Sequence, residues 1–503
     1  METVKAGQAM DGIAATAPPP LEIGWAEADV TPPLGGKRIP LDGQYYQRLA
    51  DEKSPVHLPV KFVALAMRRG DEYFLSGTID NECVWGPWQE RVRARLRELV
   101  PEIAPERVFI SCIHTHCAPP IRHSGTPLGA RIQAAQPDVW GPDEYSGFAL
   151  ERAAAAFADA WRSMRPGSVR RAFGSARIGH CRLALYADGS ARMYGDTARP
   201  DFVRMLEGED DGVEMLFTVG PDGRPTGVVA NVACPAQVME ATYQISSDIA
   251  GETRERLKAE FGPGFGMLYQ IGAAGDQSPR DLVRGYKDGF GGWDAATCSL
   301  LAGRLVRCIA EAFPRAVETP PVLHHRRLEV TVPRRKVTAG EAEAAAARLA
   351  AARAVKSDDE AKREFVADVH AREARGGPGP YDDKYMDFVR RRCDAAIVRR
   401  FEEQASRPDL TFEMHVLRIG DAAFATCPFE LYLAYGQSIK ARSRAKQTFV
   451  VEQCGGTFGY VPTPAAEQAR GYGAAILNGE IGHEGAYMLC DAAVNAVNGL
   501  FEK

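Results

Sequence analysis

Two histidines, His114 and His116, follow directly on the apolar run RVFISCI. Neutral imidazole is a common zinc ligand, and the same side chain can accept or donate a proton near neutral pH. One ring could therefore hold a metal ion while the other faces a substrate. The alternative is a pair of loop histidines whose nitrogens are satisfied by backbone groups.

A carboxylate and a phenol occupy similar positions later in the chain. Glu430 follows the apolar run AAFATC and opens the stretch ELYLAYGQSIKAR, which is predicted to be a helix. Because the helix dipole stabilises a carboxylate at a helix N-terminus, capping and catalysis are both open for Glu430. Tyr460 follows the run TFVVEQ, and a packed ring with a satisfied hydroxyl is the alternative to a functional phenol.

Ser278 is a candidate nucleophile. It lies in the segment 272–279, with Gly275 and Asp276 shortly before it. The amides of such a glycine-bearing turn can bind an anion or stabilise an oxyanion. The same residue types are ordinary in turns, so the segment alone is a weak signal.

All these candidates lie just beyond the ends of apolar strands. Five predicted strands, ending near residues 113, 233, 271, 427 and 453, each run into a short polar or glycine-bearing segment. In α/β proteins, ligands bind beyond the carboxyl ends of the strands. From Leu21 onward, short β-branched runs alternate with longer amphipathic stretches. This alternation predicts a layered α/β (α+β) fold, with a large mixed β-sheet flanked by helices.

Two regions depart from this alternation. Residues 1–20 are rich in Ala, Gly and Pro and are predicted to be a flexible arm. Residues 338–405 are rich in Ala, Glu, Arg and Lys, which predicts a helical insertion of two or three helices, broken by GGPGP at 376–380. The rest of residues 21–503 is expected to form one catalytic domain.

Composition narrows the class of protein and of partner. The chain has 503 residues, of which 45% are hydrophobic and 25% charged, as in ordinary globular proteins. A net charge of −5 gives no basic surface for nucleic acid. No stretch approaches the roughly 18–20 apolar residues of a membrane span, and the start lacks a signal core, so no stable membrane association and a cytoplasmic location are expected. The alternative is a secreted chain whose signal has been removed. The sequence predicts no particular oligomeric state.

In their order along the chain, these segments resemble the neutral, non-lysosomal ceramidase family. The resemblance covers about residues 22–495, corresponding to the N-terminal catalytic domain of that family. Five segments carry it: WAEADVTPPLG at 25–35, IHTH at 113–116, GDQSP at 275–279, PFE at 428–430 and GYVPT at 459–463. Secreted members have a C-terminal β-sandwich, whereas this sequence ends at residue 503, so no such domain is expected.

The resemblance implies one zinc ion per chain. On matching positions its ligands are His114, Glu430 and Tyr460, together with a second histidine. His116 would contact the substrate or the developing oxyanion, and Ser278 matches the proposed nucleophile of the family. The chain would then be a divergent, soluble zinc amidohydrolase.

The second metal histidine of the family is absent here. Its segment, similar to NFACHPT, corresponds to NVACPAQ at 231–237, where Pro235 cannot bind a metal. Gln237, Cys234 and Asp248 are possible substitute ligands. A thiolate would favour zinc, whereas oxygen ligands would tolerate a harder ion, so the identity of the metal stays open.

The sequence therefore predicts a metal-dependent hydrolase of an amide (N-acyl) bond in a soluble small molecule, which uses metal-activated Ser278 or water. Asp276 would position the loop, Arg280 could bind a substrate carboxylate, and Gly275 and Tyr194 would border the substrate. Two alternatives remain, namely an esterase or lactonase acting on another acyl bond, and a homologue that binds a small molecule without turning it over.

Overall fold

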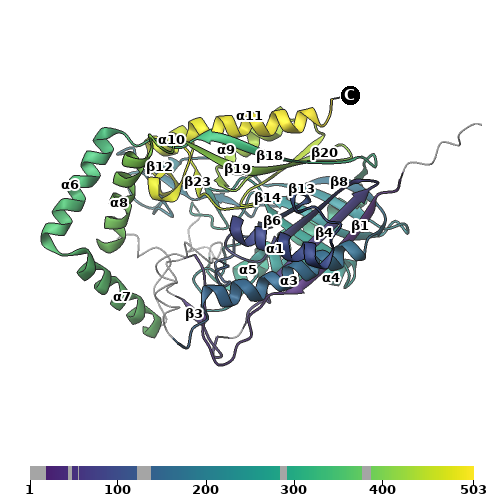
Figure 1. Ribbon diagram of the computed structural model, residues 1–503, viewed down its shortest axis with the longest axis horizontal. Coiled ribbons are helices and arrows are strands. Elements are labelled where there is room, and N and C mark those ends of the chain that lie inside the picture. Colours follow the sequence, from purple (N-terminus) through teal and green to yellow (C-terminus); the bar gives the residue numbers. More distant parts are fainter. Residues whose placement is uncertain are drawn as a thin grey trace, which may run out of the picture.

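The computed structural model describes residues 19–43, 48–54, 56–121, 137–283, 292–375 and 387–502. These ranges contain three main β-sheets with helices on their outer faces (Figure 1). The predicted layered α/β fold is confirmed, and its strands are divided among the three sheets. Most of the predicted flexible arm and the GGPGP segment lie outside the described residues.

The three sheets follow one another along the chain. The first has the order β6-β5-β4-β1-β7 and consists of β1 (Glu22–Asp29), β4 (Lys61–Arg69), β5 (Glu72–Ile79), β6 (Val108–Cys112) and β7 (Arg165–Pro166). The second has the order β15-β14-β13-β8-β17 and consists of β8 (Ser168–Ser175), β13 (Gly212–Val219), β14 (Pro225–Val232), β15 (Gly266–Ile271) and β17 (Val317–Glu318). The third has the order β18-β19-β20-β22 and consists of β18 (Leu323–Pro333), β19 (Asp409–Ile419), β20 (Ala422–Thr426) and β22 (Gln447–Val451).

Each sheet ends in one parallel pair of strands joined by a crossover helix. The pairs are β5 with β6, β14 with β15, and β20 with β22. Their crossover helices are α1 (Gly86–Leu99), α4 (Asp248–Phe261) and α9 (Leu433–Arg442). The outer members of the pairs, β6, β15 and β22, meet in the middle of the molecule, where β15 contacts both of the others. Three β-α-β units therefore point their strand ends toward a common region.

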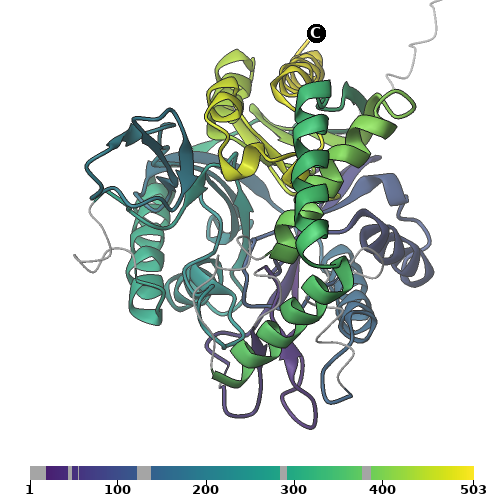
Figure 2. The ribbon, with the colours of Figure 1, turned by 90° about the vertical axis from the view of Figure 1, so that its left-hand side faces the viewer.

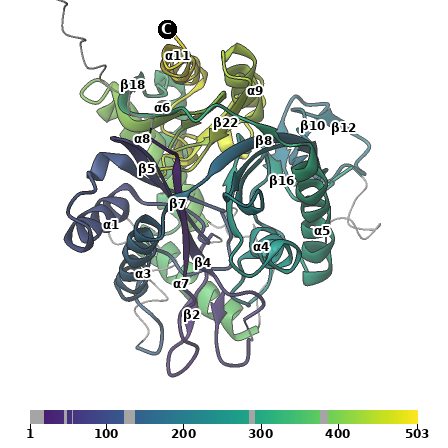
Figure 3. The ribbon, with the colours of Figure 1, turned by 90° about the vertical axis from the view of Figure 1, so that its right-hand side faces the viewer.

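Helices cover the outer face of each sheet in pairs, which Figure 3 shows around the centre of the molecule. The crossover helix is joined by α3 (Pro142–Arg162) on the first sheet, α5 (Ala295–Ala312) on the second and α11 (His483–Gly499) on the third. A separate apolar core lies under each helix pair. A fourth core, with side chains from all three sheets, fills the centre. Strands buried on both faces explain the continuous apolar runs of the sequence.

The alternation of apolar runs and amphipathic stretches in the sequence corresponds to observed elements. The apolar runs at 61–67, 72–80 and 107–113 lie in β4, β5 and β6. The amphipathic stretch at 89–99 lies in α1. In that helix the buried side chains of Trp88, Val92 and Leu96 recur every four residues and form one apolar stripe.

The predicted helical insertion is also confirmed. It consists of α6 (Ala339–Val355), α7 (Asp358–Arg375) and α8 (Asp387–Glu403). Thr338 and Glu341 form a capping box that starts α6. The three helices lie at one end of the molecule, with α6 and α7 in front of the sheets in Figure 2. No helix within the described ranges is both long and apolar enough to cross a lipid bilayer.

Candidate functional site

The segments after the six parallel strands converge and carry polar residues, most of which the sequence singled out, whereas Glu82 and Gln453 are added by the structure. Each strand end supplies one or more of them: Glu82 after β5, His114 and His116 after β6, Gln237 after β14, Asp276 and Ser278 after β15, Glu430 after β20, and Gln453 after β22. All except Glu82 are buried. The candidate residues lie together because the edges of the three sheets meet and bring the segments after their parallel strands to one place.

His114 is held so that one ring nitrogen remains available. Its Nδ1 lies 2.6 Å from the carbonyl oxygen of Glu82. A carbonyl only accepts hydrogen bonds, so Nδ1 carries the hydrogen and Nε2 carries the lone pair. Burial lowers the pKa of His114, which keeps the ring neutral. This is the form of histidine that binds metals.

The available nitrogen of His114 faces Glu430. Its Nε2 lies 3.7 Å from Oε2 of Glu430, which is beyond hydrogen-bonding distance. Two ligands of a tetrahedral zinc ion, each roughly 2.1 Å from the metal, would lie about 3.4 Å apart. The separation therefore suits two donors of one metal ion better than a direct hydrogen bond.

Glu430 and Tyr460 are neighbours in a short parallel pairing. Glu430 begins β21 (Glu430–Leu431) and is in register with Tyr460 of β23 (Tyr460–Val461). Burial, followed by the charge of Glu430, raises the pKa of the Tyr460 phenol. The helix α9 begins only at Leu433, with Tyr432 at its N-cap position, so Glu430 does not cap that helix.

Arg182 adds a positive charge to this group. Its Nη2 donates to the carbonyl of Gly275 at 2.8 Å and to the hydroxyl of Tyr460 at 3.3 Å. The same nitrogen lies 4.0 Å from Oε2 of Glu430. A buried guanidinium is therefore fixed beside the candidate metal ligands.

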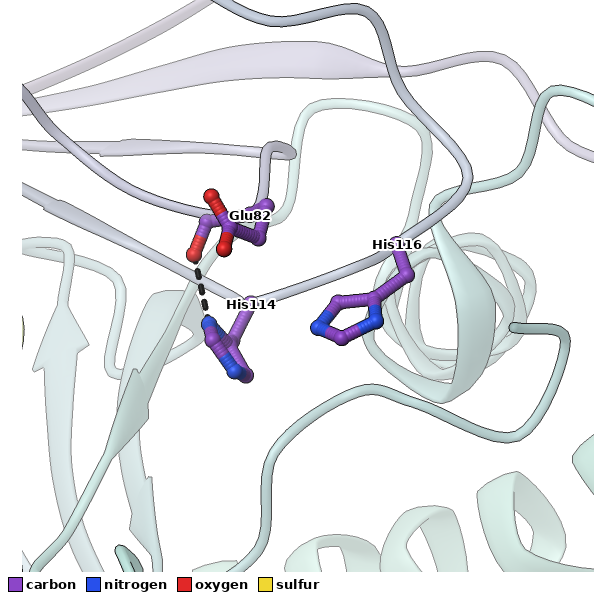
Figure 4. Close-up of side chains that lie close together, drawn as sticks. All are labelled: Glu82, His114 and His116. Atoms are coloured by element: carbon purple, nitrogen blue, oxygen red, sulfur yellow. Dashed lines mark hydrogen bonds between the residues drawn. The ribbon is translucent and has the colours of Figure 1, made fainter. Parts of the chain in front are cut away.

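Figure 4 shows that Glu82 and His116 lie next to His114, with one ring nitrogen of His116 turned toward it. Ligand atoms of Glu82, His114 and His116 all lie within 4.8 Å of one another, so these residues could also hold a metal ion. His116 has further partners on both nitrogens. Its Nδ1 lies 3.0 Å from Oε2 of Glu240, and its Nε2 lies 2.8 Å from Nε2 of Gln237.

The loop that carries Ser278 is docked directly on the Glu430 strand. The amide of Gly275 donates to the carbonyl of Leu431 at 2.9 Å. A Cβ at Gly275 would lie 2.4 Å from the Glu430 carbonyl oxygen, so only glycine permits this approach. Asp276 accepts from the amide of Leu433 at 2.9 Å, and burial raises the pKa of Asp276 to about 6. Its predicted role in positioning the loop agrees with this contact.

Ser278 itself is fully buried in β16 (Gln277–Ser278), which pairs with β9 (His180–Cys181). Its Oγ accepts a hydrogen bond from the amide of Arg280 at 3.2 Å. The predicted nucleophile is therefore on the same loop as Gly275 and Asp276, whose backbone at Gly275 contacts β21.

Two of the three predicted substitute ligands are engaged elsewhere. Gln237 contacts His116 through its Nε2, whereas its buried Oε1 has no hydrogen-bond partner among the described residues. The thiol of Cys234 donates to the carbonyl of Ile178 at 3.4 Å, and burial raises its pKa, which favours the protonated form. The two carboxylate oxygens of Asp248 each accept a backbone amide at 2.7 Å, from Met239 and from Ile249.

Arg280 and Tyr194, two of the residues predicted to bind or border the substrate, differ in their surroundings. Arg280 is buried and donates to the carbonyls of Gln237 and Val238 at 3.1 and 3.2 Å. It therefore braces the segment that holds His116, and its guanidinium is occupied by backbone carbonyls. Tyr194 lies beside Arg182, whose guanidinium carbon is 6.0 Å from the centre of the tyrosine ring.

Sequence reasoning missed Glu82, Arg182 and Glu240. Glu82 could have been found, because the apolar strand YFLSGTI runs into the polar segment DNE, which is the signal that identified the other strand ends. Arg182 and Glu240 lie in irregular segments without such a signal.

No protein-family model matches the sequence, and no curated protein matches it. Solved structures do match the fold. One is a ceramidase complexed with C2, with a TM-score of 0.68 and 16% identity over 96% of this chain and 75% of that one. Another is neutral ceramidase from Pseudomonas aeruginosa, with a TM-score of 0.67 and 16% identity over 96% of this chain and 74% of that one. The chain therefore has a ceramidase-like fold at low sequence identity, which confirms the predicted resemblance at the level of the fold.

Proposed function

We propose that this protein, which has the fold of neutral ceramidase, is a metal-dependent hydrolase of an amide bond in a soluble small molecule. The observation that carries the proposal is the position of the His114 Nε2 lone pair, 3.7 Å from the Glu430 carboxylate with Tyr460 beside it. The likeness to ceramidase structures supports an amide as the scissile bond.

The donors present suit a divalent metal such as zinc. His114, Glu430 and Tyr460 would hold it, and the neighbouring Glu82 and His116 offer further donors around the same imidazole. One or two nitrogens with several oxygen donors are compatible with zinc and also with harder ions. A bound metal in this position supplies a polarised carbonyl and a more acidic hydroxyl or water.

The protein's own side chains would orient the substrate and stabilise charge. The guanidinium of Arg182 is fixed by Gly275 and Tyr460, so it can stabilise negative charge on a substrate oxygen without moving. His116 lies beside Glu240 at Nδ1 and Gln237 at Nε2, so its ring lines the site in a fixed orientation. Ser278, on the loop that lies against Glu430, is the candidate nucleophile.

A binding protein without catalysis is the second candidate. Pro235 stands where the family has a metal histidine. Arg182 also offers its own positive charge to Tyr460 and Glu430, as expected in a site that has replaced a cation by a side chain. This reading predicts affinity for a small molecule but no turnover.

The test is hydrolysis of a panel of N-acyl amides and matched esters, by the protein as purified, after chelation and after addition of zinc. The proposal predicts amide hydrolysis that chelation abolishes and zinc restores, and that Ser278→Ala or Glu430→Gln removes. Ser146→Ala, which changes a buried serine of α3, is the matched control and should keep full activity. Ester hydrolysis alone would favour the acyl hydrolase alternative, and binding without turnover would favour the binding protein.

A further inference from the structure

Two residues of the site adopt a backbone conformation that side chains disfavour. His114 has a φ of 63° and Gln453 a φ of 49°, both in the left-handed region. Non-glycine residues rarely occupy this region, and such strain persists mainly where the surrounding structure imposes it, often at functional sites. His114 lies just after the end of β6 and Gln453 just after the end of β22, and these two strands belong to different sheets.

The side chains of these two strained residues are in contact. The carboxamide of Gln453 lies against Nδ1 of His114, with its Nε2 at 2.8 Å and its Oε1 at 3.1 Å. The thiol of Cys112 donates to the same Oε1 at 3.1 Å. The side chain of Gln453 is 1% exposed, and the backbone amide of the same residue donates to the carbonyl of Phe429 at 3.0 Å. Both the side chain and the backbone of Gln453 therefore have little freedom.

This contact completes the restraint on the imidazole. The carbonyl of Glu82 accepts the hydrogen of His114 Nδ1 from the side of β5, and Oε1 of Gln453, 3.1 Å from the same nitrogen, is a second acceptor for that hydrogen from the side of β22. With Nδ1 confined from two sheets, Nε2 is directed at Glu430. Groups that orient a metal-binding histidine through its second nitrogen influence metal affinity without touching the metal.

We infer that Gln453 is a positioning residue that holds the ring of His114 for metal binding, and that the strained backbone at both positions is retained for this purpose. The inference rests on the proposed metal-dependent function. It assigns Gln453 a role in metal affinity that is separate from folding, since folding alone would favour a glycine at a left-handed position.

The inference predicts that one substitution, Gln453→Gly, lowers metal affinity without lowering thermal stability. It relieves the backbone strain but removes the carboxamide. We expect it to raise or leave unchanged the thermal midpoint of the metal-free protein, while it weakens binding of Zn²⁺ or Co²⁺ by about 10–100-fold. Gln453→Leu keeps the strain and removes the polar contact, so it should weaken metal binding without any gain in stability.

The matched control is Arg470→Gly. Arg470 has a φ of 54° but is exposed and lies in the segment after α10 (Pro464–Gln468). This substitution should raise the thermal midpoint and leave metal affinity unchanged.

The experiment measures metal affinity by competition with a chromophoric chelator, the visible spectrum of the Co²⁺ form, and the thermal midpoint of the metal-free protein. An unchanged Co²⁺ affinity and spectrum in Gln453→Gly would overturn the inference while leaving the proposed function in place. A wild-type protein that binds neither ion would overturn the proposed function and the inference together.

Discussion

Two of the histidine–glutamate pairs among the described residues differ in how closely their members approach. In one, His415 Nε2 lies 2.6 Å from Oε1 of Glu413. In the other, His114 Nε2 lies 3.7 Å from Oε2 of Glu430. The first distance is that of a strong, charge-assisted hydrogen bond, whereas the second leaves space between the two atoms.

The surroundings of the first pair satisfy its members completely. His415 Nδ1 lies 2.8 Å from Nε2 of His325, and Arg93 Nη2 lies 2.6 Å from Oε1 of Glu413. We call Arg93, Glu413, His415 and His325 the closed cluster. Arg93 also donates to the carbonyl of Val108 in β6, while the other three members belong to β18 and β19. The closed cluster therefore joins the edge of the first sheet to the third.

The comparison shows that residue types alone do not reveal a site. A histidine and a glutamate stabilise the fold when each donor lies at hydrogen-bonding distance from an acceptor. They form a candidate set of metal ligands when the histidine lone pair and the carboxylate face each other beyond that distance. The closed cluster lies on the sheets themselves, whereas His114 and Glu430 lie just beyond the ends of parallel strands, where ligands usually bind.

The largest loss in the free energy of unfolding should come from a substitution in the closed cluster. Arg93→Leu removes a buried cation that pairs with Glu413 and donates to β6. Because it removes one of the two arginines that pair with Glu413, and a buried donor to the carbonyl of Val108, while Arg327 stays paired with Glu413, we expect the free energy of unfolding to fall by about 1.5–3 kcal/mol, as measured by urea denaturation. Arg95→Leu, on the same helix but in exposed ion pairs with Glu98 and Glu151, should change stability little. Equal effects of the two substitutions would contradict a structural role for the closed cluster.

Acid should weaken the closed cluster. Burial lowers the pKa of His325 to about 2, and burial also lowers that of His415. The unfolded chain binds protons on these histidines below about pH 6.5, whereas the folded chain does not. Their contribution is therefore complete above pH 6.5 and is lost as the pH falls, by about 1.4 kcal/mol per pH unit for His325.

This dependence can be isolated by comparison with His325→Gln, which removes one of the two titrating groups. The difference in unfolding free energy between wild type and variant should shrink as the pH falls from 7.5 to 5. A difference that stays constant over this range would show that His325 titrates alike in the folded and unfolded chains.

The smallest effect on stability should come from a substitution in the pair His114 and Glu430, whose nearest side-chain atoms are 3.7 Å apart. In Glu430→Gln, the lost charge lies 3.7 Å from its nearest histidine nitrogen and 4.0 Å from Arg182. It also lies near Glu452, a buried carboxyl whose pKa its charge helps to raise. We therefore expect the metal-free variant to be within about 1 kcal/mol of wild type in urea denaturation, as is common when functional residues are replaced. A loss as large as that of Arg93→Leu would place Glu430 among the structural residues.

Much of the fold could be predicted because the strands are short continuous apolar runs and the helices have apolar residues at helical spacing. The boundaries of β4 and β5 and the stripe of α1 follow from local sequence. The division into three sheets could not be predicted, because the strand runs are buried on both faces and carry no signal of which sheet they join.

The candidate site was predictable only in part. His114 and Glu430 were found because each follows an apolar strand, and their proximity in the structure depends on the meeting of two sheets. Arg182 and Glu240 escaped because their contacts with Tyr460 and His116 cross long distances in sequence. Arg280 was predicted to contact the substrate. The sequence does not reveal that its guanidinium donates instead to the backbone carbonyls of residues 237 and 238.

Metal content is the most direct test of the central claim, which is that the space between His114 and Glu430 holds a metal ion. Wild type, His114→Ala and Glu430→Gln would be loaded with zinc, freed of unbound ions and analysed by mass spectrometry of the metal. We predict one zinc per chain in wild type and loss of that zinc in both variants, which should remain folded. A wild type without stoichiometric metal, or variants that keep it, would contradict the account.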